Sequence, residues 1–536
     1  MANKSPNELG RVLCMLQNRR EFLQLFGKGL GYGALASVLP ACGGSGGGSS
    51  GDDSATTASV TLPKPSPEYT VLKRTSFGAH RDALSEIQAL GINDYLEQQL
   101  DYLAIDVSAL ETEISTQFPL TLQTPAQLIA GFPDNIFDVA TQMIAATQYR
   151  QMFSQRQLYE VMVEFWSDHF NIHLVNGLGP TLKPGDDQQV IRQHALGNFG
   201  TLLKASARSS AMLFYLDNFL SVAGNANENY ARELMELHTL GVDGGYTEND
   251  VKEVARCFTG WSLRFPGDPG GAYGEFVFQN SIHDNLQKTV LGHPIAAGGG
   301  QTDGEQVLDI LATHPSTANF IATKLCRRFI SDTPSQATVD AVAAAFTGSN
   351  GDIKETLRAL FATPAFVDTA DLKFTRPSEY LAGLVRALAP DTAYPPDKGL
   401  TWFYAQNTLG QIPFYWPTPD GYPDRQTYWA STGGLLNRWR LSFLSLDIPS
   451  ILNLGIIDID YLPMLNGADT ISTVTDAIAD TVLMRPLSND DRRTIIEWLK
   501  GYLNVAEDDV LPSGVPELTA ALTAAVLISS AYFHLR

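Results

Sequence analysis

The chain has 536 residues, several times the usual domain length of roughly 100–150, so it is long enough to bury one very large core or two fused ones. Hydrophobic residues make up 44% and charged residues 18%, as in ordinary globular proteins, and no stretch reaches the roughly 20 apolar residues that a membrane-spanning helix requires. The net charge is −21. The first 42 residues hold five basic and two acidic side chains, a charge of +3, so the rest of the chain carries −24. An acidic body repels phosphate backbones, which excludes nucleic acid as an expected partner.

The first 42 residues resemble a twin-arginine lipoprotein signal. Arg19 and Arg20 precede a weakly apolar, glycine-rich stretch over residues 25–39. That stretch ends in Leu-Pro-Ala-Cys, which is similar to a lipobox whose Cys42 becomes the lipidated first residue of the mature protein. We therefore expect two partners, the twin-arginine translocase and the membrane that holds the lipid anchor. The expected location is the periplasm or the cell surface.

Residues 43–66 form a Gly/Ser-rich segment with too few apolar side chains to fold. We interpret it as a flexible tether between the lipid anchor and a globular body. After the tether we predict a helical main domain over residues 67–390. Residues 391–536 are predicted to hold an aromatic and proline-rich loop region and C-terminal helices that pack on the main domain.

Apolar residues at spacings of three and four predict helices through most of the body. The segments with this pattern are 80–103, 125–146, 153–173, 188–208, 228–240, 248–260, 304–312, 316–331, 336–347, 352–362, 377–388, 473–483, 488–503 and 515–531. The clearest strand signal is at 275–278, which we expect to pair in a hairpin around the Gly/Pro-rich stretch 266–274. Residues 389–437 show little helical period and are predicted to form a long structured loop. The fold class is therefore mainly α, a large multi-helix body with a minor β-hairpin and a long loop rich in proline and aromatic residues.

The body contains two cysteines, Cys257 and Cys326, and no C-x-x-C motif. This excludes a disulfide framework and a zinc ribbon. One bridge between the two would be compatible with an oxidising compartment. Because both lie in apolar helical patterns, where free cysteine acts as a small hydrophobe, we predict that they are buried and unlinked.

Eight short motifs occur in a fixed order between about residues 67 and 445. The longest is NENYARELMELHTLG at 227–241, and the others are at 71–78, 165–170, 191–197, 255–261, 283–288, 314–318 and 410–414. Together they resemble a bacterial family known as domain of unknown function 1800. Members of that family are typically exported and their activity is unassigned, so the resemblance implies fold and location but no chemistry. His173 lies outside the motif that contains His169.

His169 falls at the centre of the apolar face when residues 158–173 are placed on a helical wheel. His173 follows at i+4, and two imidazoles one turn apart are suited to binding a divalent metal. The competing interpretation is strong, because a buried histidine usually bonds to a carbonyl or carboxylate and no Glu follows His169 to give H-E-x-x-H.

Glu233 points to the core side of the predicted helix 228–240, where a carboxylate must be paired, protonated or bound to metal. Glu236 lies on the same side of that helix, so the two carboxylates are candidates for catalysis together with His169. Glu233 and His169 are also candidates for metal binding. Glu228, Arg232 and Glu236 could instead form a salt-bridge ladder. Glu233 escapes that explanation and is the best single candidate.

Further polar residues are weaker candidates. His283 and Asp284 are catalytic candidates in a predicted loop, and Arg192, His194 and Lys288 are candidates for substrate binding. No G-x-S-x-G, P-loop or G-x-G-x-x-G motif occurs, which argues against a serine hydrolase of the usual elbow type, an NTPase and a dinucleotide enzyme.

The loop that begins near residue 401 is crowded with aromatic side chains, among them Trp416. Exposed aromatic planes can stack on sugar rings, so we include Trp416 as a substrate-binding candidate and polysaccharide as a candidate partner. Such a loop more often folds its aromatic side chains onto its own body.

These observations support two hypotheses. The first is an extracytoplasmic lipoprotein enzyme that acts on an envelope or extracellular polymer, with a divalent metal as a candidate cofactor. The alternative is a non-catalytic surface lipoprotein that scaffolds or binds polysaccharide or protein. The first hypothesis predicts that Glu233 and His169 approach each other in one pocket, with Arg192, His194, Glu236, His283 or Asp284 in its wall.

Overall fold

The computed structural model describes residues 62–388, 399–445 and 459–536. Arg19, Arg20, Cys42 and most of the predicted tether lie outside the described residues. The body begins with helix α4 (Pro67–Thr75), whose first turn is capped by the Ser66 hydroxyl, which accepts a hydrogen bond from the Tyr69 amide at 3.1 Å.

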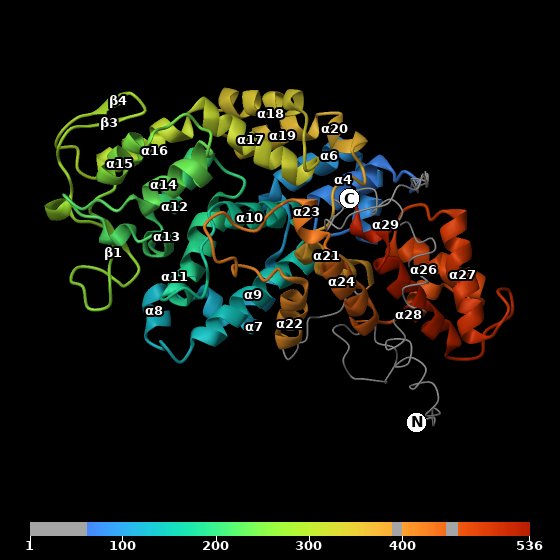
Figure 1. Ribbon diagram of the computed structural model, residues 1–536. Helices are drawn as coiled ribbons and strands as arrows, with labels where there is room; N and C mark the ends of the chain where they lie inside the picture. Colours follow the sequence, from blue (N-terminus) through green and yellow to red (C-terminus); the bar gives the residue numbers. More distant parts are fainter. Residues whose placement is uncertain (1–61, 389–398, 446–458) are drawn as a thin grey trace, which may run out of the picture.

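Helices follow one another through the first half of the body (Figure 1). They are α5 (Arg81–Leu90), α6 (Ile92–Leu100), α7 (Ser108–Gln117), α8 (Pro125–Ile129), α9 (Ile136–Phe153), α10 (Gln157–His169), α11 (Gly179–Asp186), α12 (Phe199–Arg208), α13 (Ser210–Tyr215), α14 (Glu228–Glu233) and α15 (Glu248–Cys257). Short 3₁₀ turns lie among them and just after them, at η1 (Tyr102–Ala104), η2 (Pro119–Leu122), η4 (Asn218–Leu220) and η6 (Asn280–Ile282).

Two antiparallel hairpins interrupt the helices. Strand β1 (Trp261–Leu263) pairs with β2 (Phe276–Phe278), so the predicted hairpin around 266–274 is confirmed. Strand β3 (Lys288–Val290) pairs with β4 (His293–Ile295). The second hairpin was not predicted, because its strands carry Lys288, His293 and Pro294 and lack the run of apolar residues that marks β2.

The second half of the chain is again helical. Its helices are α16 (Thr302–Ala312), α17 (Pro315–Phe329), α18 (Gln336–Gly348), α19 (Ile353–Phe361), α20 (Ala365–Asp368), α21 (Pro377–Leu388), α22 (Gly399–Leu409), α23 (Gln426–Trp429), α24 (Thr432–Ser445), α25 (Leu462–Leu465), α26 (Ile471–Val482), α27 (Asn489–Leu503), α28 (Val515–Ile528) and α29 (Ala531–His534). The predicted mainly α class is therefore confirmed.

Two of the predicted segments differ from the structure in an instructive way. The segment 80–103 is divided into α5 and α6 at Gly91, whose φ of 87° ends the first helix. The predicted loop 389–437 contains α22, α23 and the start of α24, so that prediction is wrong for a large part of its length. The sequence of α22 carries aromatic and small side chains all round and shows no clear apolar stripe, which concealed the helix.

Two helices continue into π-helical turns. Helix α11 runs into η3 (Asp187–Arg192), and α14 runs into η5 (Leu234–Thr239). A π-turn rotates the residues after it relative to an ideal α-helix, and such turns are frequent at functional sites. The turn η5 falls inside the longest of the sequence motifs.

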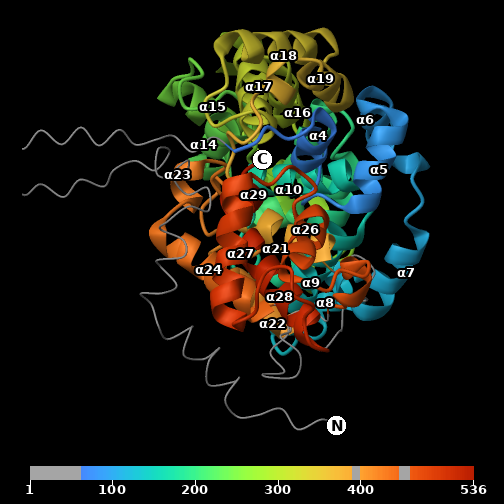
Figure 2. The same cartoon turned by 90° about the vertical axis from the view of Figure 1, so that its right-hand side faces the viewer.

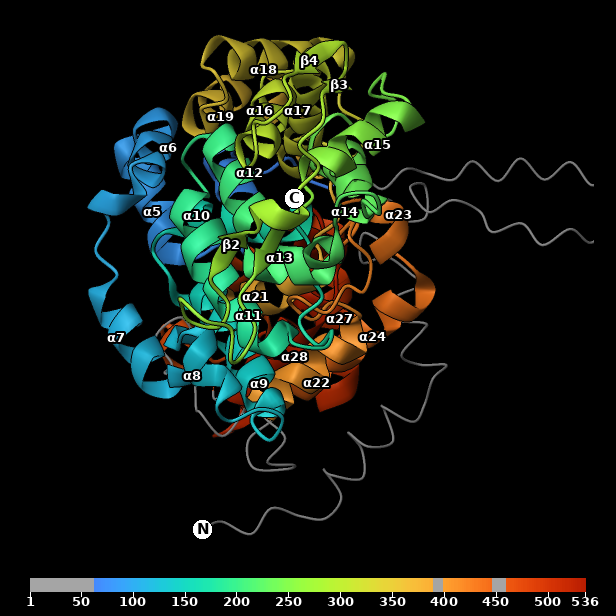
Figure 3. The ribbon, with the colours of Figure 1, turned by 90° about the vertical axis from the view of Figure 1, so that its left-hand side faces the viewer.

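The helices pack around one extended hydrophobic core that runs from Tyr69 to Phe533. Figures 1 and 2 show α24, α26, α27 and α28 grouped at one end of the body. Figure 3 shows the opposite end, where both hairpins, α13 and α15 are gathered. None of the helices in the described part of the chain is long and apolar enough to span a bilayer.

Cys257 and Cys326 are buried and unlinked, as predicted. Burial raises the pKa of each thiol to about 12. Both therefore serve as small core side chains.

Candidate active site

A pocket of about 240 Å³ opens between helices α10 and α17 and the loop that precedes α23. Its wall combines apolar side chains with an unusual density of charge. The apolar part is Phe165, Leu237, Phe320, Tyr422 and Pro423, and the charged part is Asp168, Lys324, Arg327, Arg328, Arg376, Asp420, Asp424 and Arg425. In a protein with a net charge of −21, this is a local concentration of cations.

Helix α17 supplies most of the positive wall. Phe320, Lys324 and Arg328 follow one another at i, i+4 and i+8, a spacing that places them on one face of a helix, and Arg327 stands beside them. Pro315 at the first helical position and the His314 side chain, which accepts from the Ser316 amide at 3.1 Å, fix where this helix starts.

Asp168 lies near the end of α10 and faces the pocket. Its Oδ2 accepts a hydrogen bond from Arg376 Nη1 at 2.8 Å. Burial raises the pKa of this carboxyl to about 7, against the opposing charges of Lys324 and Arg328. The ion pair with Arg376 also favours the carboxylate and so opposes the effect of burial.

The next residue, His169, is buried beneath the pocket and holds Lys324. Its Nε2 lies 3.0 Å from the carbonyl oxygen of His238, and its Nδ1 lies 3.0 Å from Lys324 Nζ. Since a carbonyl only accepts and an ammonium only donates, Nε2 carries the hydrogen and Nδ1 is the acceptor. Burial and the charge of Lys324 lower the pKa of His169 well below its ordinary value, which agrees with a neutral ring.

Lys324, Arg327 and Arg425 make no ion pair with any carboxylate of the described residues. Burial lowers the pKa of Lys324 to about 8, although Asp168 counteracts the effect. Burial also lowers the pKa of Arg327, and the neighbouring positive charge of Arg425 adds to that effect. Asp168, Asp420 and Asp424 raise the pKa of Lys324, and Asp424 and Asp332 that of Arg327, without forming ion pairs with them. Cations without an ion pair of their own are suited to receive an anionic group.

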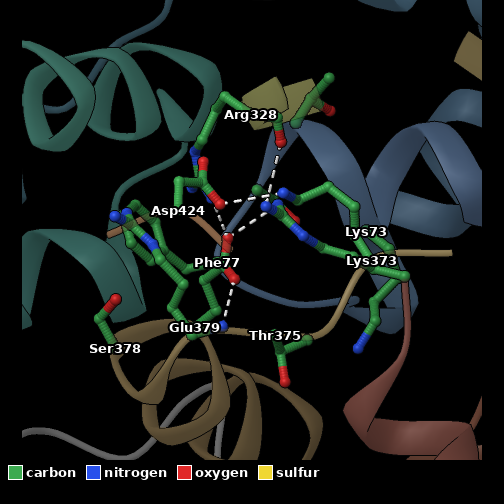
Figure 4. A network of polar contacts seen from close by, with 12 residues as sticks. Lys73, Phe77, Arg328, Lys373, Thr375, Ser378, Glu379 and Asp424 are labelled. Atoms are coloured by element: carbon green, nitrogen blue, oxygen red, sulfur yellow. Dashed lines mark hydrogen bonds and ion pairs between the residues drawn. The ribbon is translucent and has the colours of Figure 1, made fainter. Parts of the chain in front are cut away.

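Behind the pocket, the charged side chains form ion pairs with one another. Glu379 accepts from Arg328 at 2.5 Å and from Arg536 at 2.7 Å, and Arg376 also pairs with Glu164. Burial alone would raise the pKa of Glu379, but the charges of Arg328, Arg536 and Arg376 lower it to about 2. Figure 4 shows this network and, beside it, Asp424, which pairs with Lys373 at 3.0 Å.

A model of one protein family matches residues 70–534, and its description is "Protein of unknown function (DUF1800)". The chain belongs to this family. No curated protein and no solved structure matches the chain. The match extends across both predicted regions, 67–390 and 391–536, and it includes every residue that lines the pocket.

Within the family domain, the segment that carries Glu233 is wound differently from the ideal helix of the prediction. Glu233 is partly exposed, whereas His238 is buried, because the π-turn η5 rotates the second half of the segment. Glu233 stands one turn before Leu237 of the pocket wall. Burial and the negative charges of Glu236 and Asp420 raise its pKa.

Glu236 belongs to the salt-bridge ladder that was the competing interpretation. Arg232 lies 3.9 Å from Glu228, 3.5 Å from Glu236 and 2.8 Å from Glu248. Glu236 therefore belongs to a surface ion-pair cluster, whereas Glu233 forms no ion pair with the described residues.

His283, Asp284 and Lys288 form a separate cluster near β3 and α15, at one end of the molecule and away from α10 (Figure 1). His283 Nε2 lies 3.2 Å from Asp303, which pairs with Lys288 at 2.6 Å, and Asp284 pairs with Arg256 at 2.7 Å. The side chains of His283 and Lys288 are wholly buried. The structure does not bring these three residues to the pocket.

Arg192 and His194 also lie apart from the pocket. Arg192 is buried between Glu160 at 3.1 Å and Asp187 at 2.9 Å, in an ion-pair cluster inside the helices. His194 is partly exposed, and burial lowers its pKa. The expectation of a helix through 173 is wrong, because α10 ends at His169 and His173 follows in a loop, so the two rings are not one helical turn apart.

Trp416 belongs to the aromatic loop and packs on the pocket rim. Its Nε1 donates to Asp420 at 2.8 Å, and its ring lies 5.0 Å from that of Tyr422 and 5.7 Å from that of Tyr428. The loop thus folds most of its aromatic side chains onto one another and onto the body.

For a metal, the described residues offer no group of three or more His, Cys, Asp or Glu side chains that could hold an ion. Both ring nitrogens of His169 are engaged, so His169 could ligate a metal only if Lys324 or the His238 carbonyl moved away. The proposed metal role of His169 and Glu233 stays a prediction.

Sequence reasoning missed Asp168, Lys324, Arg327, Arg376 and the acidic residues of the loop. Asp168 is part of the motif at 165–170, but its neighbour His169 drew attention first. The signal that could have found the others is the stripe of Phe320, Lys324 and Arg328 on α17, since two cations one turn apart on a half-buried face require a partner.

Proposed function

We propose that this protein is an extracytoplasmic, lipid-anchored enzyme that acts on a small anionic substrate, or on an anionic group of an envelope polymer, bound in the pocket between α10 and α17. The observation that carries the proposal is the set of three cations, Lys324, Arg327 and Arg425, that border the pocket without a carboxylate partner. The apolar side chains Phe165 and Phe320 favour a ligand with a hydrocarbon part beside its anionic group.

Asp168 and Lys324 supply acid–base chemistry in this proposal. Their pKa values, about 7 and about 8, lie near the pH of the envelope, where a group can both take up and release a proton. Asp168 would act as the base. Lys324, fixed by His169 Nδ1, would donate a proton or stabilise the negative charge that develops on the substrate.

Binding of hexanoate, measured by isothermal titration calorimetry, tests the anion pocket. Lys324→Met or Arg327→Met removes a charge-assisted hydrogen bond worth about 1.5–3 kcal/mol, so the affinity should fall roughly ten- to hundredfold. Arg493→Met is the matched control, because Arg493 is an exposed arginine that pairs only with Asp490 on α27. Equal affinity in all four proteins would reject the pocket.

Catalysis is tested by incubating the natively exported protein with cell-envelope fractions and comparing the soluble products by mass spectrometry. Asp168→Asn keeps the shape of the side chain and its contact with Arg376 but removes the base. Products that form with the wild type and not with Asp168→Asn support the enzyme. Identical product profiles for the wild type, Asp168→Asn and a blank would reject it.

A non-catalytic role in binding polysaccharide is the second candidate. The observation that favours it is Tyr428, which is 47% exposed and stands edge-on to Trp416 beside the pocket rim. In that case Tyr428→Ala would weaken binding of envelope polysaccharide, while Asp168→Asn would leave it unchanged.

A further inference from the structure

We infer that the ligand of this pocket is a zwitterion, an amino-acid-like molecule whose carboxylate lies between Lys324, Arg327 and Arg425 and whose ammonium group lies between Glu233 and Asp420. The inference rests on the proposed anion pocket and adds the chemical class of its ligand. It follows from charges of both signs that border one pocket and leave each other unpaired.

The acidic side consists of one carboxylate that lines the pocket and one that lies beside it on another element. Asp420 belongs to the pocket wall, and Glu233 stands one helical turn before Leu237, another wall residue. The negative charge of Asp420 acts on Glu233, which places the two carboxylates near each other.

Neither carboxylate has a cationic partner among the described residues. Asp420 accepts hydrogen bonds only from neutral groups, Trp416 Nε1 at 2.8 Å and Thr418 Oγ1 at 2.5 Å. Glu233 makes no hydrogen bond or ion pair in the described part of the chain, although Arg232 is its neighbour in sequence, because Arg232 turns toward Glu248. Two like charges brought together in partial burial are unfavourable unless a cation joins them.

The cationic side is built in the same way. Arg327 and Arg425 both line the pocket, and Lys324 is held by the neutral ring of His169. Long charged side chains on a surface ordinarily pair with opposite charges within reach, and every other charge of the pocket wall does so: Asp168 and Arg376, Arg328 and Glu379, Asp424 and Lys373.

Lys324, Arg327, Arg425 and Asp420 thus line one pocket without an ion pair between them, although Asp420 is near enough to Lys324 to raise its pKa. A ligand with both charges would supply an anionic group to the three cations and a cationic group to Glu233 and Asp420, whereas a simple anion would draw Lys324 away from Asp420. The volume of about 240 Å³ admits a short chain between the two charged ends. This selects ω-amino acids and the ends of short peptides over alkanoates of the same length.

Calorimetric titration with matched ligands tests the inference. The probes are 4-aminobutanoate, 6-aminohexanoate and 8-aminooctanoate, each compared with the alkanoate of the same chain length and with hexylamine. We expect at least one ω-amino acid to bind about tenfold or more tightly than its alkanoate, the gain of one further charge-assisted contact, and hexylamine to bind more weakly than either.

Glu233→Gln and Asp420→Asn should each lower the ratio of the ω-amino acid affinity to the alkanoate affinity, about tenfold, toward equal binding of the two. The matched control is Glu236→Gln, which removes a neighbouring carboxylate of the same helix that is already paired with Arg232. Melting temperatures of all variants show that the fold is kept, and the wild-type comparison stands even where one variant fails to fold.

The outcomes separate the two proposals. If the wild type binds alkanoates and no ω-amino acid more tightly, the zwitterion is rejected and the anion pocket survives. If it binds neither, the anion pocket itself is rejected. If Glu236→Gln lowers the affinity as much as Glu233→Gln, a general effect of negative charge replaces the specific contact, and the inference is overturned.

Discussion

Lys324 is the residue whose surroundings say most about the chemistry of the pocket. An ammonium group that is held by a neutral imidazole, rather than by a carboxylate, keeps its charge available to a ligand. Because burial lowers its pKa to about 8, that charge is present at neutral pH and disappears at moderately alkaline pH.

This gives a prediction for the pH dependence of binding. The affinity for hexanoate should fall as the pH rises from 6 to 9, first because Asp168 ionises near pH 7 and then because Lys324 loses its proton near pH 8. Lys324→Arg should abolish the second part of the fall, since a guanidinium stays charged. Calorimetric titrations at intervals over this range measure the effect, and an affinity that rises with pH would contradict it.

Glu379 shows a different use of a buried carboxylate. It compensates Arg328 and Arg536, and its removal leaves both charges buried, so Glu379→Gln should lower the free energy of unfolding by about 3–5 kcal/mol at pH 7. Equilibrium unfolding in urea measures this. The same change at the unpaired Glu233 should cost less than about 0.5 kcal/mol, the usual range for surface substitutions.

The sign of the pH dependence follows from the pKa of Glu379, about 2 in the folded protein against an ordinary value of 4.5. A depressed carboxyl pKa contributes stability that is complete above 4.5 and is lost as the pH falls toward 2. The difference between wild type and Glu379→Gln should therefore shrink over that interval. A difference that stayed constant from pH 7 to pH 3 would count against the ion-pair network as its cause.

At the scale of the elements, the loop before α23 depends on one glycine. Gly421 has a φ of 71°, and a Cβ atom placed on it would lie 2.0 Å from the carbonyl oxygen of Asp168. The loop therefore rests directly on the end of α10 and carries Asp420, Tyr422 and Asp424 into the pocket wall. A side chain at this position must lift the loop.

Gly421→Ala should accordingly lower the melting temperature and abolish binding of hexanoate. Gly410→Ala is the matched control, because Gly410 also has a positive φ, 85°, but nothing within 4 Å of its hypothetical Cβ. The control should show only the cost of the backbone conformation, about 1 kcal/mol. If the two variants bind hexanoate equally well, the loop does not shape the pocket.

The helices show how far sequence patterns reach. Amphipathic helices such as α15, α19 and α26 lie close to their predicted bounds, because one polar and one apolar face leave a clear period. Helix α22 was missed, since its apolar and polar residues are not separated into two faces and it lacks that period. The π-turn η5 could not be predicted, because one extra residue in a single turn does not change the spacing of apolar residues enough to be recognised. This turn accounts for the different burial of Glu233 and His238.

At the scale of the whole molecule, the pocket unites segments that lie far apart in the sequence: 165–168, 237, 320–328, 376 and 420–425. His169 and Glu233 were predicted as members of one site from their own helices alone. Neither lines the pocket, although His169 holds its Lys324 and Glu233 precedes its Leu237 by one turn. The cations that complete it come from a third helix and a loop, and only the packing of α10 against α17 and the loop reveals them.

Export remains a prediction that belongs to the whole protein. Replacing Arg19 and Arg20 together by lysine should leave the precursor in the cytoplasm, because the translocase recognises the arginine pair. Immunoblots of cytoplasmic and envelope fractions measure this, with Arg11→Lys as a control that leaves the pair intact. Normal export of the double variant would reject the twin-arginine signal.

The lipid anchor is tested separately. Cys42→Ala should abolish labelling with a fatty-acid analogue and release the body from membranes, since the predicted acyl chains would have no cysteine to carry them. Retention of unlabelled Cys42→Ala protein in the membrane fraction would show that something other than a lipid holds it.

The two buried cysteines give the mature body an internal reporter that needs no engineering. Each thiol is buried, unlinked and, with a pKa of about 12, almost wholly protonated, so a thiol reagent can modify it only when the surrounding helices open. Cys326 lies on α17, between Lys324 and Arg328, whereas Cys257 ends α15 at the hairpin end of the molecule. A ligand that occupies the pocket should slow the labelling of Cys326 more than that of Cys257, which would allow compound libraries to be screened by mass spectrometry on the unmodified protein.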